Sequence, residues 1–441
     1  MALFTEKVTP INFKKSMTCI SHGARIDYEI SAEELVLEAE DGLVGGTIFS
    51  FSYEKCTAEA GSRPILFAFN GGPGSSSLWM HMGMFGPYVV NGAGTLVENN
   101  EWLIDCFDIV MIDPVSTGYA RLYREEAGES FFGAMPDALT VARFIRRWMR
   151  ARNRGNSPIF LAGESYGATR ASLAAYLLDD VDVRGILYIG PGYSSDWEPP
   201  RTLKDLIPAS AAAWYHQKAS QGQTLEQVLH RCREFLYQDY LHALIMGSQL
   251  DENRKRSVAE ILSQLTGLSA DYYVKHELLV SREDICKKLL EDEKEELGFF
   301  DTRYTQPAGT EDEAFSRQLG PAYRAGLRKY LREVLDLQVD RDYRYSAMDV
   351  NKIWVYESNP TMATALRTAM KAKPKLRIFF ATGYFDICAT VENTRFSVTH
   401  SGLPMERVEM HEYISGHMVY ADDEARKLLT EDIRNWVNAD K

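Results

Sequence analysis

The chain has 441 residues, of which 45% are apolar and 25% are charged, a composition typical of soluble globular proteins. It excludes a coiled coil, a collagen-like fibre and general disorder as descriptions of the whole chain. The net charge of −13, from 49 basic and 62 acidic residues, argues against nucleic acid and anionic membrane as partners, since both need clustered Lys and Arg. No apolar run is long enough for a membrane-spanning helix.

The N-terminal segment is interrupted by charged residues and has no signal-peptide pattern. We therefore expect a cytoplasmic protein, or a secreted one if a leader has been removed. The cysteines contain no CxxC pair, so the usual spacing of zinc ligands is missing. A chain of this length does not need disulfides, and we expect buried free thiols. The cysteines are Cys19, Cys56, Cys106, Cys232, Cys286 and Cys388.

Strand patterns dominate the first part of the chain. Residues 24–55 alternate apolar and polar side chains around a turn sequence, which predicts two strands. Short apolar runs then recur, each with Gly, Pro or Asp close to its end. Continuous apolar strands of this kind predict a sheet covered on both faces. The runs are 64–72, 107–114, 157–165, 185–192 and 375–383.

Helical patterns separate several of these runs, as at 134–152 and 166–179. The alternation predicts an α/β fold with a mostly parallel central sheet. Residues 194–345 are instead rich in helix formers and charge, and strand-like runs stop there. We therefore predict a first part of the α/β core at 1–193, a helical cap insertion at 194–345 and a second part of the core at 346–441.

Finer elements can be predicted within these segments. Inside the insertion, 226–245 and 282–300 have helical patterns, and the acidic stretch 309–313 is expected to be an exposed loop. Near the C-terminus, 407–413 resembles a strand, and 420–437 is a helical stretch that closes the domain.

The strongest local motif is Gly163-Glu164-Ser165-Tyr166-Gly167, which matches G-x-S-x-G. An apolar strand precedes it and a helix pattern follows, as a nucleophile elbow requires. The turn is so tight that bulky neighbours would clash, so the serine is exposed on a strained backbone. Ser165 is thus the predicted nucleophile.

A serine nucleophile needs a base and a group that orients the base. In α/β-hydrolases the chain order is Ser, then Asp or Glu, then His. Asp386 follows the strand 375–383, and His417 follows the strand-like segment 407–413. Both fall where a parallel sheet presents its site loops. His417 is preferred because Gly416 precedes it and a helix follows; the other candidates are His81, His216, His276, His400 and His411.

Backbone N–H donors must stabilise the charge that develops on the substrate oxygen. Asn70-Gly71-Gly72-Pro73-Gly74 directly follows an apolar strand, and its glycines allow close backbone approach. One donor is expected from this loop and the other from Tyr166, immediately after the nucleophile. A phosphate-binding P-loop is excluded because no Lys-Ser/Thr follows.

Five motifs in order resemble the serine carboxypeptidase family of α/β-hydrolases. They are FNGGPGSSSLWMHMGMFGP, MIDPVSTGYAR, GESYG, GYFDICAT and ISGHMV, over roughly residues 60–200 and 375–425. The middle third carries no recognisable motif, as expected where this family places its variable cap. The resemblance implies an α/β-hydrolase fold with a mostly parallel central sheet and a helical cap insertion.

The resemblance also implies roles for single residues. The triad would be Ser165, Asp386 and His417; the oxyanion hole would be the amides of Gly72 and Tyr166; and the substrate's terminal carboxylate would be bound by Asn70, the amide of Gly71 and Glu164. A carboxylate facing the substrate carboxylate shares a proton with it, so Glu164 would act as a neutral donor and favour mildly acidic pH. No metal and no organic cofactor are expected.

Two positions depart from the family pattern. Ser75 stands where secreted members usually carry a disulfide cysteine, which suggests a disulfide-poor subgroup common in bacteria. Many members also carry an acidic residue about 14 positions past the first Asn of the NGGPG motif. Here that stretch is Met80-His81-Met82-Gly83-Met84, so the leaving group could differ.

The favoured function is a carboxypeptidase that releases C-terminal residues from peptides through an acyl-enzyme. An alternative keeps the triad for an esterase, amidase or acyltransferase acting on a small ester or modified peptide, and a third reading is a non-catalytic binding protein. The expected partner is a peptide or small acyl substrate. The sequence leaves open whether the chain forms a homodimer.

Overall fold

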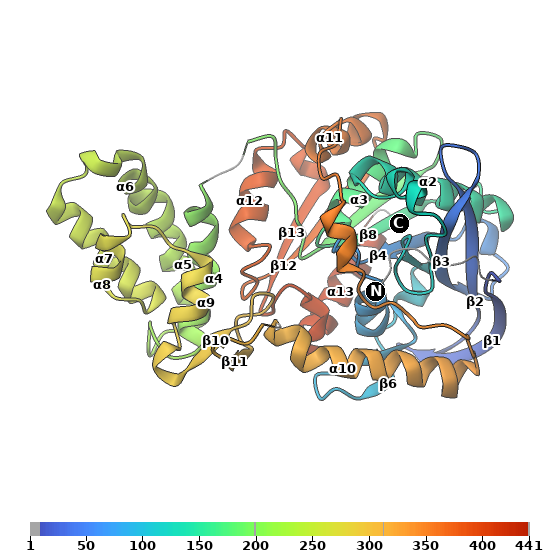
Figure 1. Cartoon of the computed structure of the whole chain (residues 1–441), viewed down its shortest axis with the longest axis horizontal. Helices are drawn as coiled ribbons and strands as arrows, with labels where there is room; N and C mark the ends of the chain where they lie inside the picture. The colour runs from blue at the N-terminus through green and yellow to red at the C-terminus, as the bar shows by residue number, and fades with distance from the viewer. Residues whose placement is uncertain (1–8, 198–199, 312, 440–441) are drawn as a thin grey trace.

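A nine-stranded sheet forms the centre of the part of the chain that the computed structural model describes, residues 9–197, 200–311 and 313–439 (Figure 1). The strand order is β1-β2-β3-β7-β4-β8-β9-β12-β13. Strands β1 to β3 pair antiparallel, as does β3 with β7, and the remaining neighbours pair in parallel. The strands are β1 (Asn12–Ser21), β2 (Ala24–Glu38), β3 (Val44–Lys55), β4 (Ile65–Phe69), β7 (Asp108–Asp113), β8 (Ile159–Glu164), β9 (Val183–Ile189), β12 (Arg377–Gly383) and β13 (Val408–Tyr413).

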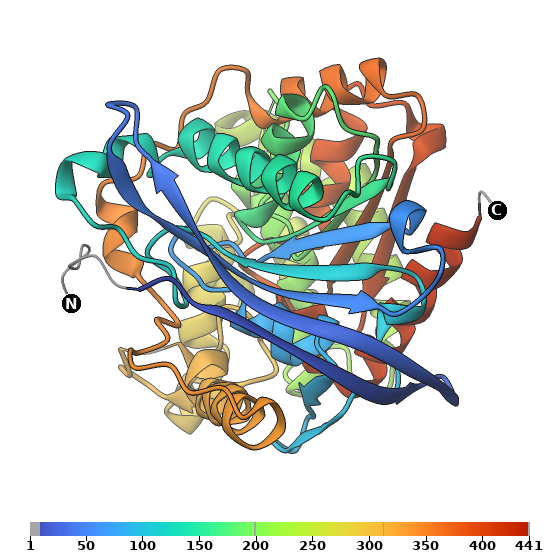
Figure 2. The ribbon, with the colours of Figure 1, turned by 90° about the vertical axis from the view of Figure 1, so that its right-hand side faces the viewer.

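Both faces of the sheet are buried, because side chains alternate between two apolar cores. In β4, Ile65 and Phe67 belong to one core, and Leu66 and Ala68 belong to the other. Figure 2 shows helices on opposite sides of the twisted strands. The first core is covered by α2 (Ala134–Ala151), α3 (Gly167–Leu177) and α11 (Met362–Ala372), and the second by α10 (Ala314–Lys329) and α13 (Asp423–Asn438).

The predicted strands and flanking helices are confirmed at these positions. Strand β1 was not predicted. It is an edge strand whose side chains alternate between exposed and half-buried. Its lysines weaken the apolar alternation by which a strand is recognised in the sequence. The short hairpin of β5 (Tyr88–Val90) and β6 (Leu96–Glu98) was not predicted either. All six cysteines are free, but only three are buried: Cys56 is exposed, and Cys19 and Cys388 are half-buried, contrary to the expectation of burial.

A helical lobe projects from one end of the sheet and has an apolar core of its own (Figure 1). The predicted helix at 226–245 is confirmed as α5 and α6 with a π-helical turn between them. The helices are α4 (Arg201–Tyr215), α5 (Leu225–Phe235), α6 (Leu241–Met246), α7 (Glu252–Thr266), α8 (Ala270–Lys275) and α9 (Arg282–Lys288). No helix of the described chain combines the length and apolar character needed to cross a membrane.

The end of the lobe differs from prediction. The helix expected over 282–300 ends at Lys288, and β10 (Glu295–Leu297) pairs with β11 (Thr305–Pro307), so strands do occur in this segment. Within the predicted acidic loop 309–313, Asp312 lies outside the described residues. Glu313 ends the loop by accepting the Ser316 amide at 2.8 Å, and it caps α10.

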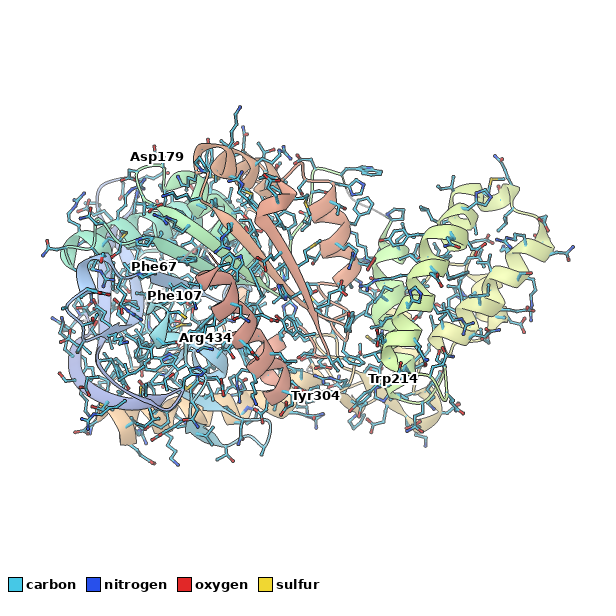
Figure 3. All side chains as sticks on the ribbon, turned by 180° about the vertical axis from the view of Figure 1, so that it is seen from behind. Phe67, Phe107, Asp179, Trp214, Tyr304 and Arg434 are labelled. Carbon is cyan, nitrogen blue, oxygen red and sulfur yellow. The ribbon has the colours of Figure 1, made fainter. Side chains whose placement is uncertain are left out.

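Helix α10 leaves the lobe and runs along the sheet domain (Figure 1). Its apolar residues, such as Phe315 and Leu327, belong to the core of the sheet domain and not to the core of the lobe. The segment 194–345 is therefore divided in its packing. Figure 3 shows Trp214 and Tyr304 near the junction; Trp214 packs on the lobe core and Tyr304 on the sheet core.

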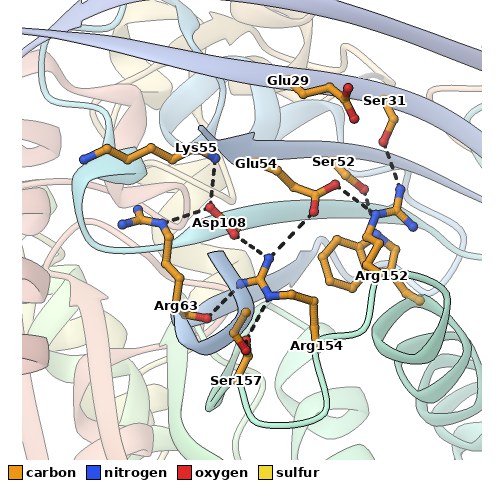
Figure 4. Close-up of polar contacts among 12 residues, drawn as sticks. Glu29, Ser31, Ser52, Glu54, Lys55, Arg63, Asp108, Arg152, Arg154 and Ser157 are labelled. Atoms are coloured by element: carbon orange, nitrogen blue, oxygen red, sulfur yellow. Dashed lines mark hydrogen bonds and ion pairs between the residues drawn. The ribbon is translucent and has the colours of Figure 1, made fainter. Parts of the chain in front are cut away.

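A buried ion cluster joins the amino ends of the parallel strands (Figure 4). Asp108 begins β7 and is fully buried. Its carboxylate accepts from Arg63 Nε at 2.9 Å, from Arg154 Nη1 at 2.6 Å and from the Lys55 amide at 3.0 Å. Because these residues come from four chain segments, the cluster fixes the sheet edge opposite the carboxyl ends of the strands.

We expect Asp108→Ala to reduce the free energy of unfolding by about 3–5 kcal/mol, since it leaves the half-buried Arg63 without its carboxylate and the buried Arg154 with only Glu54, at 3.7 Å. Asp182→Ala is the matched control: its ion pair with Arg184 is exposed, and its loss should cost under about 1 kcal/mol. Urea unfolding checks both, and equal losses would contradict the role assigned to the cluster.

Candidate active site

Ser165 occupies a strained turn between β8 and α3. Its φ is +56°, in the left-handed region that L residues rarely adopt, and its side chain is only partly buried. An added Cβ on Gly163 would lie 2.2 Å from the Gly167 carbonyl oxygen, so the turn requires glycine there. The Ser165 amide donates to the Ile189 carbonyl at 3.1 Å, which ties the turn to β9.

The glycine-rich loop after β4 packs directly on this turn. An added Cβ on Gly71 would lie 2.5 Å from the Tyr166 amide nitrogen. Arg170 Nη1 donates to the Asn70 carbonyl at 2.6 Å and so holds the start of the loop against α3. Within the described residues, no hydrogen bond uses the amide of Gly72 or Tyr166. Two neighbouring N–H groups are therefore available to an oxyanion.

Asp386 and His417 form a buried hydrogen-bonded pair in the loops after β12 and β13. His417 Nδ1 lies 2.7 Å from Asp386 Oδ2. The other carboxylate oxygen, Oδ1, accepts from the amides of Cys388 and Ala389, each at 2.8 Å. With Nδ1 donating to Asp386, Nε2 of a neutral His417 is left as the acceptor.

Gly190 connects this pair to the serine turn. It follows Ile189, whose carbonyl accepts the Ser165 amide, and its backbone packs on the histidine. An added Cβ on Gly190 would lie 3.0 Å from His417 Nδ1 and 2.3 Å from its carbonyl oxygen. The end of β9 thus contacts both the Ser165 turn and the His417 loop.

The charges around His417 favour its protonated form. Burial of the imidazole lowers its pKa, but the charge and hydrogen bond of Asp386, with further contributions from Glu164 and Glu313, raise the pKa above its ordinary value. Such an imidazole accepts a proton readily, as a general base must.

Cys388 completes the one group of side chains among the described residues that could present three ligand atoms to a metal, together with Asp386 and His417. The thiolate, not the thiol, binds metals. Burial raises the pKa of the Cys388 thiol, so it stays protonated at neutral pH. These three side chains are therefore better suited to a hydrogen-bonded His–Asp pair beside a neutral thiol than to metal binding.

A segment between β10 and β11 covers His417, and the sequence did not reveal it. The Phe300 ring stacks on the imidazole with centroids 5.1 Å apart, and the Phe300 carbonyl accepts the His417 amide at 2.7 Å. An added Cβ on Gly416 would lie 2.4 Å from Asp301 Cβ, which explains the glycine before the histidine. The lobe hairpin thereby positions the catalytic candidate and shields it from water.

Glu164 lies beside Ser165 in a buried polar cluster. Asn70 Nδ2 donates to Glu164 Oε1 at 2.7 Å, and the Tyr420 hydroxyl donates to Oε2. Asn70 Oδ1 accepts the Met80 amide at 3.1 Å, which fixes the orientation of the amide group. Burial raises the pKa of the Glu164 carboxyl to about 7, against the lowering effect of His417 and of its two hydrogen-bond donors.

Tyr420 lies next to residues 80–84, the stretch in which many family members carry a second acid and this chain carries none. An added Cβ on Gly83 would lie 2.3 Å from the Tyr420 ring and 3.1 Å from the Tyr323 hydroxyl. The Met84 side chain is fully buried in the core. The Tyr323 hydroxyl is buried and has no hydrogen-bond partner among the described residues. Two phenols thus stand near Glu164, and no sequence motif pointed to either.

The fold and the site define a class before any comparison: an α/β-hydrolase with a serine at the elbow and a buried His–Asp pair. A solved structure agrees with this class. The prohormone-processing carboxypeptidase Kex1 of Saccharomyces cerevisiae superimposes with a TM-score of 0.59 at 14% identity, over 93% of this chain and 92% of that one. The similarity confirms the predicted fold.

The family model for serine carboxypeptidases matches residues 45–428, and the chain belongs to that family. Two curated relatives match over short regions. The serine carboxypeptidase ctsa-3.2 of Caenorhabditis elegans is 30% identical over 31% of this chain and 27% of its own length. The pheromone-processing carboxypeptidase KEX1 of Meyerozyma guilliermondii is 32% identical over 31% of this chain and 22% of its own length.

A fluorophosphonate probe should label Ser165 in the wild type and fail to label Ser165→Ala. The rate should rise with pH through the His417 pKa, because only the neutral imidazole accepts the serine proton. Asp386→Asn should slow labelling at least about a hundredfold and move the pH midpoint down, since the charge that raises the His417 pKa is lost.

Mass spectrometry of the labelled peptide and the rate at several pH values check this prediction. The exposed Asp182→Asn change is the matched control and should alter neither value. Labelling of a different serine, or unchanged labelling in Asp386→Asn, would contradict the assignment of the pair.

Proposed function

We propose that the protein is a serine carboxypeptidase that releases single C-terminal residues from peptides. The observation that carries the proposal is the buried Asn70–Glu164–Tyr420 cluster, which lies one residue from Ser165. A hydrolase that recognises only the acyl group of its substrate does not require a buried carboxyl beside its nucleophile. A peptidase that reads a terminal carboxylate needs hydrogen-bond donors at that place.

The chemical steps follow from the geometry of the loops. Ser165 Oγ attacks the carbonyl carbon of the last peptide bond while His417 Nε2 takes the hydroxyl proton. The amides of Gly72 and Tyr166 stabilise the oxyanion. His417 then gives the proton to the leaving amine, and the acyl-enzyme ester is hydrolysed by water that His417 deprotonates. Asp386 keeps the imidazole in the required tautomer throughout.

The terminal carboxylate is held by Asn70, the Gly71 amide and Glu164. A substrate carboxylate adds a second negative charge beside Glu164, which favours the protonated form of Glu164 further. In that form Glu164 donates a hydrogen bond to the substrate. Because burial already raises the pKa of Glu164 to about 7, the donor form is present below about pH 7 and is lost above it.

The pH dependence of kcat/KM for free-acid peptides should therefore have two limbs. Activity rises as His417 loses its proton and falls above about pH 7 as Glu164 ionises. The same peptides with a C-terminal amide or ester lack the carboxylate. Their pH profile should keep the rise that His417 causes but should not show the fall above about pH 7. Glu164→Gln should lower kcat/KM for free acids about 10- to 100-fold, with little effect on amides and esters.

Two further variants sharpen this experiment. Tyr420→Phe removes a hydrogen bond that lowers the pKa of Glu164, so the upper limb should move to higher pH. Glu40→Gln, at an exposed position, is the matched control and should change nothing. Equal losses on free acids, amides and esters in Glu164→Gln would contradict carboxylate recognition.

The same machinery could instead act on a small ester or modified peptide, because Met84 replaces the family's second acid. The substrate pairs distinguish the two functions. Intact peptides beside fast cleavage of a simple activated ester would favour the second function, and ester products formed with an added alcohol would indicate acyl transfer.

A further inference from the structure

A hollow of about 1380 Å³ lies between α10 and the segment 337–346, outside the site described above. Five arginines and two aspartates line it, which leaves a surplus of three positive charges in a chain whose net charge is −13. The lining also includes tyrosine and leucine side chains. The arginines are Arg324, Arg328, Arg332, Arg341 and Arg344, and the aspartates are Asp340 and Asp342.

One wall is the basic face of a helix. Arg324, Arg328 and Arg332 follow each other at four-residue spacing on α10 and the π-helical turn after it, so they share a face. Arg324 lies over the Tyr345 ring, 5.7 Å from its centroid. Among the described residues, no carboxylate forms an ion pair with any of these three arginines. Like charges at this spacing destabilise a helix.

The opposite wall holds Arg341, whose side chain is 12% exposed. One of its terminal nitrogens pairs with Glu34, but Nε and Nη1 are buried without a hydrogen-bond partner among the described residues. These two nitrogens are enclosed by the protein, and the Tyr119 ring centroid lies 6.0 Å from the guanidinium carbon. Arg341 therefore contributes positive charge to this wall, partly balanced by Glu34, and no free donor. Burial, with the charges of Arg344 and Arg341, also lowers the pKa of the nearby Arg121 to about 10, as crowded cations do.

The segment that forms this wall also borders the glycine-rich loop after β4, which holds the predicted oxyanion donor Gly72. The Tyr345 carbonyl accepts the Ser76 amide at 3.1 Å, and the Ala347 amide donates to the Gly74 carbonyl at 2.7 Å. Ser346 lines the hollow and is bridged to Ser75. The hollow and the Gly72 loop are therefore separated by one extended strand of backbone.

We infer that the hollow binds an acidic peptide segment, with aspartate or glutamate side chains placed between the arginines of α10 and Arg341. Its volume is far larger than one small anion requires, and its surplus of cations complements clustered carboxylates. The position beside the oxyanion loop suits residues of a bound peptide outside the cleaved bond. This last role rests on the proposed function, whereas binding itself does not.

The test uses the Ser165→Ala variant of the 441-residue chain and two labelled peptides with amidated C-termini, one rich in glutamate and one with glutamine in its place. At 50 mM NaCl the acidic peptide should bind three- to tenfold more tightly by fluorescence anisotropy, and the preference should shrink at 300 mM NaCl. Arg328→Gln with Arg332→Gln should abolish the preference. Arg143→Gln with Arg150→Gln removes the same charge from exposed positions on α2 and should leave it intact.

Equal binding of the two peptides, or equal effects of the two double variants, would overturn the inference. A third result would also overturn it: inorganic phosphate stabilises the wild type but not the Arg328→Gln, Arg332→Gln variant, and the acidic peptide does not bind. The site would then bind a free oxyanion. In the active enzyme, the same peptides with free C-termini should show the same preference in kcat/KM. Binding without cleavage of any peptide would contradict the proposed function and leave the hollow as a peptide site.

Discussion

The site depends on backbone segments that pack too closely for any side chain between them. Gly71 lies against the Ser165 turn, and Gly163 lies against Gly167 within it. At the end of β12, an added Cβ on Gly383 would lie 2.2 Å from the carbonyl oxygens of Ser415 and Gly416. These contacts lock the glycine-rich loop after β4, the serine turn and the histidine loop onto neighbouring strand ends. The relative positions of their polar groups are therefore set by backbone contact and not by flexible side chains.

The buried charges in this frame act on one another. Glu164 raises the pKa of His417, and His417 lowers the pKa of Glu164. Tyr420, three residues after His417, donates to Glu164, so one short segment supplies both the candidate base and a partner of the carboxyl. In the proposed mechanism, substrate binding and proton transfer consequently share one electrostatic environment. This coupling gives a physical reason why the protonation state of Glu164 should matter for free-acid peptides.

Much of the sheet was predictable because its strands are buried on both faces and read as continuous apolar runs. The turn at Ser165 was predictable because strand, glycines and helix are adjacent in the chain. Asp386 and His417 follow strands that end at the same sheet edge, so their proximity follows from topology. Each of these predictions rests on local sequence or on a general property of parallel sheets.

The remaining features depend on contacts between distant segments. Phe300 reaches His417 only because a hairpin of two three-residue strands, each too short for a strand pattern, folds back from the lobe. Tyr420 and Tyr323 approach Glu164 from separate helical regions, and nothing in their local sequence distinguishes them from core tyrosines. The arginines of α10, the opposing Arg341 and the hollow between them belong to no motif that the sequence analysis identified.

Mass spectrometry of N-blocked peptides incubated in ¹⁸O-labelled water tests the central claim most directly. Stepwise loss of single C-terminal residues, with one ¹⁸O in each new terminal carboxylate and no cleavage elsewhere, is the predicted result at the pH of greatest activity. Internal cleavage, or intact peptides under conditions in which the enzyme hydrolyses an activated ester, would contradict the account.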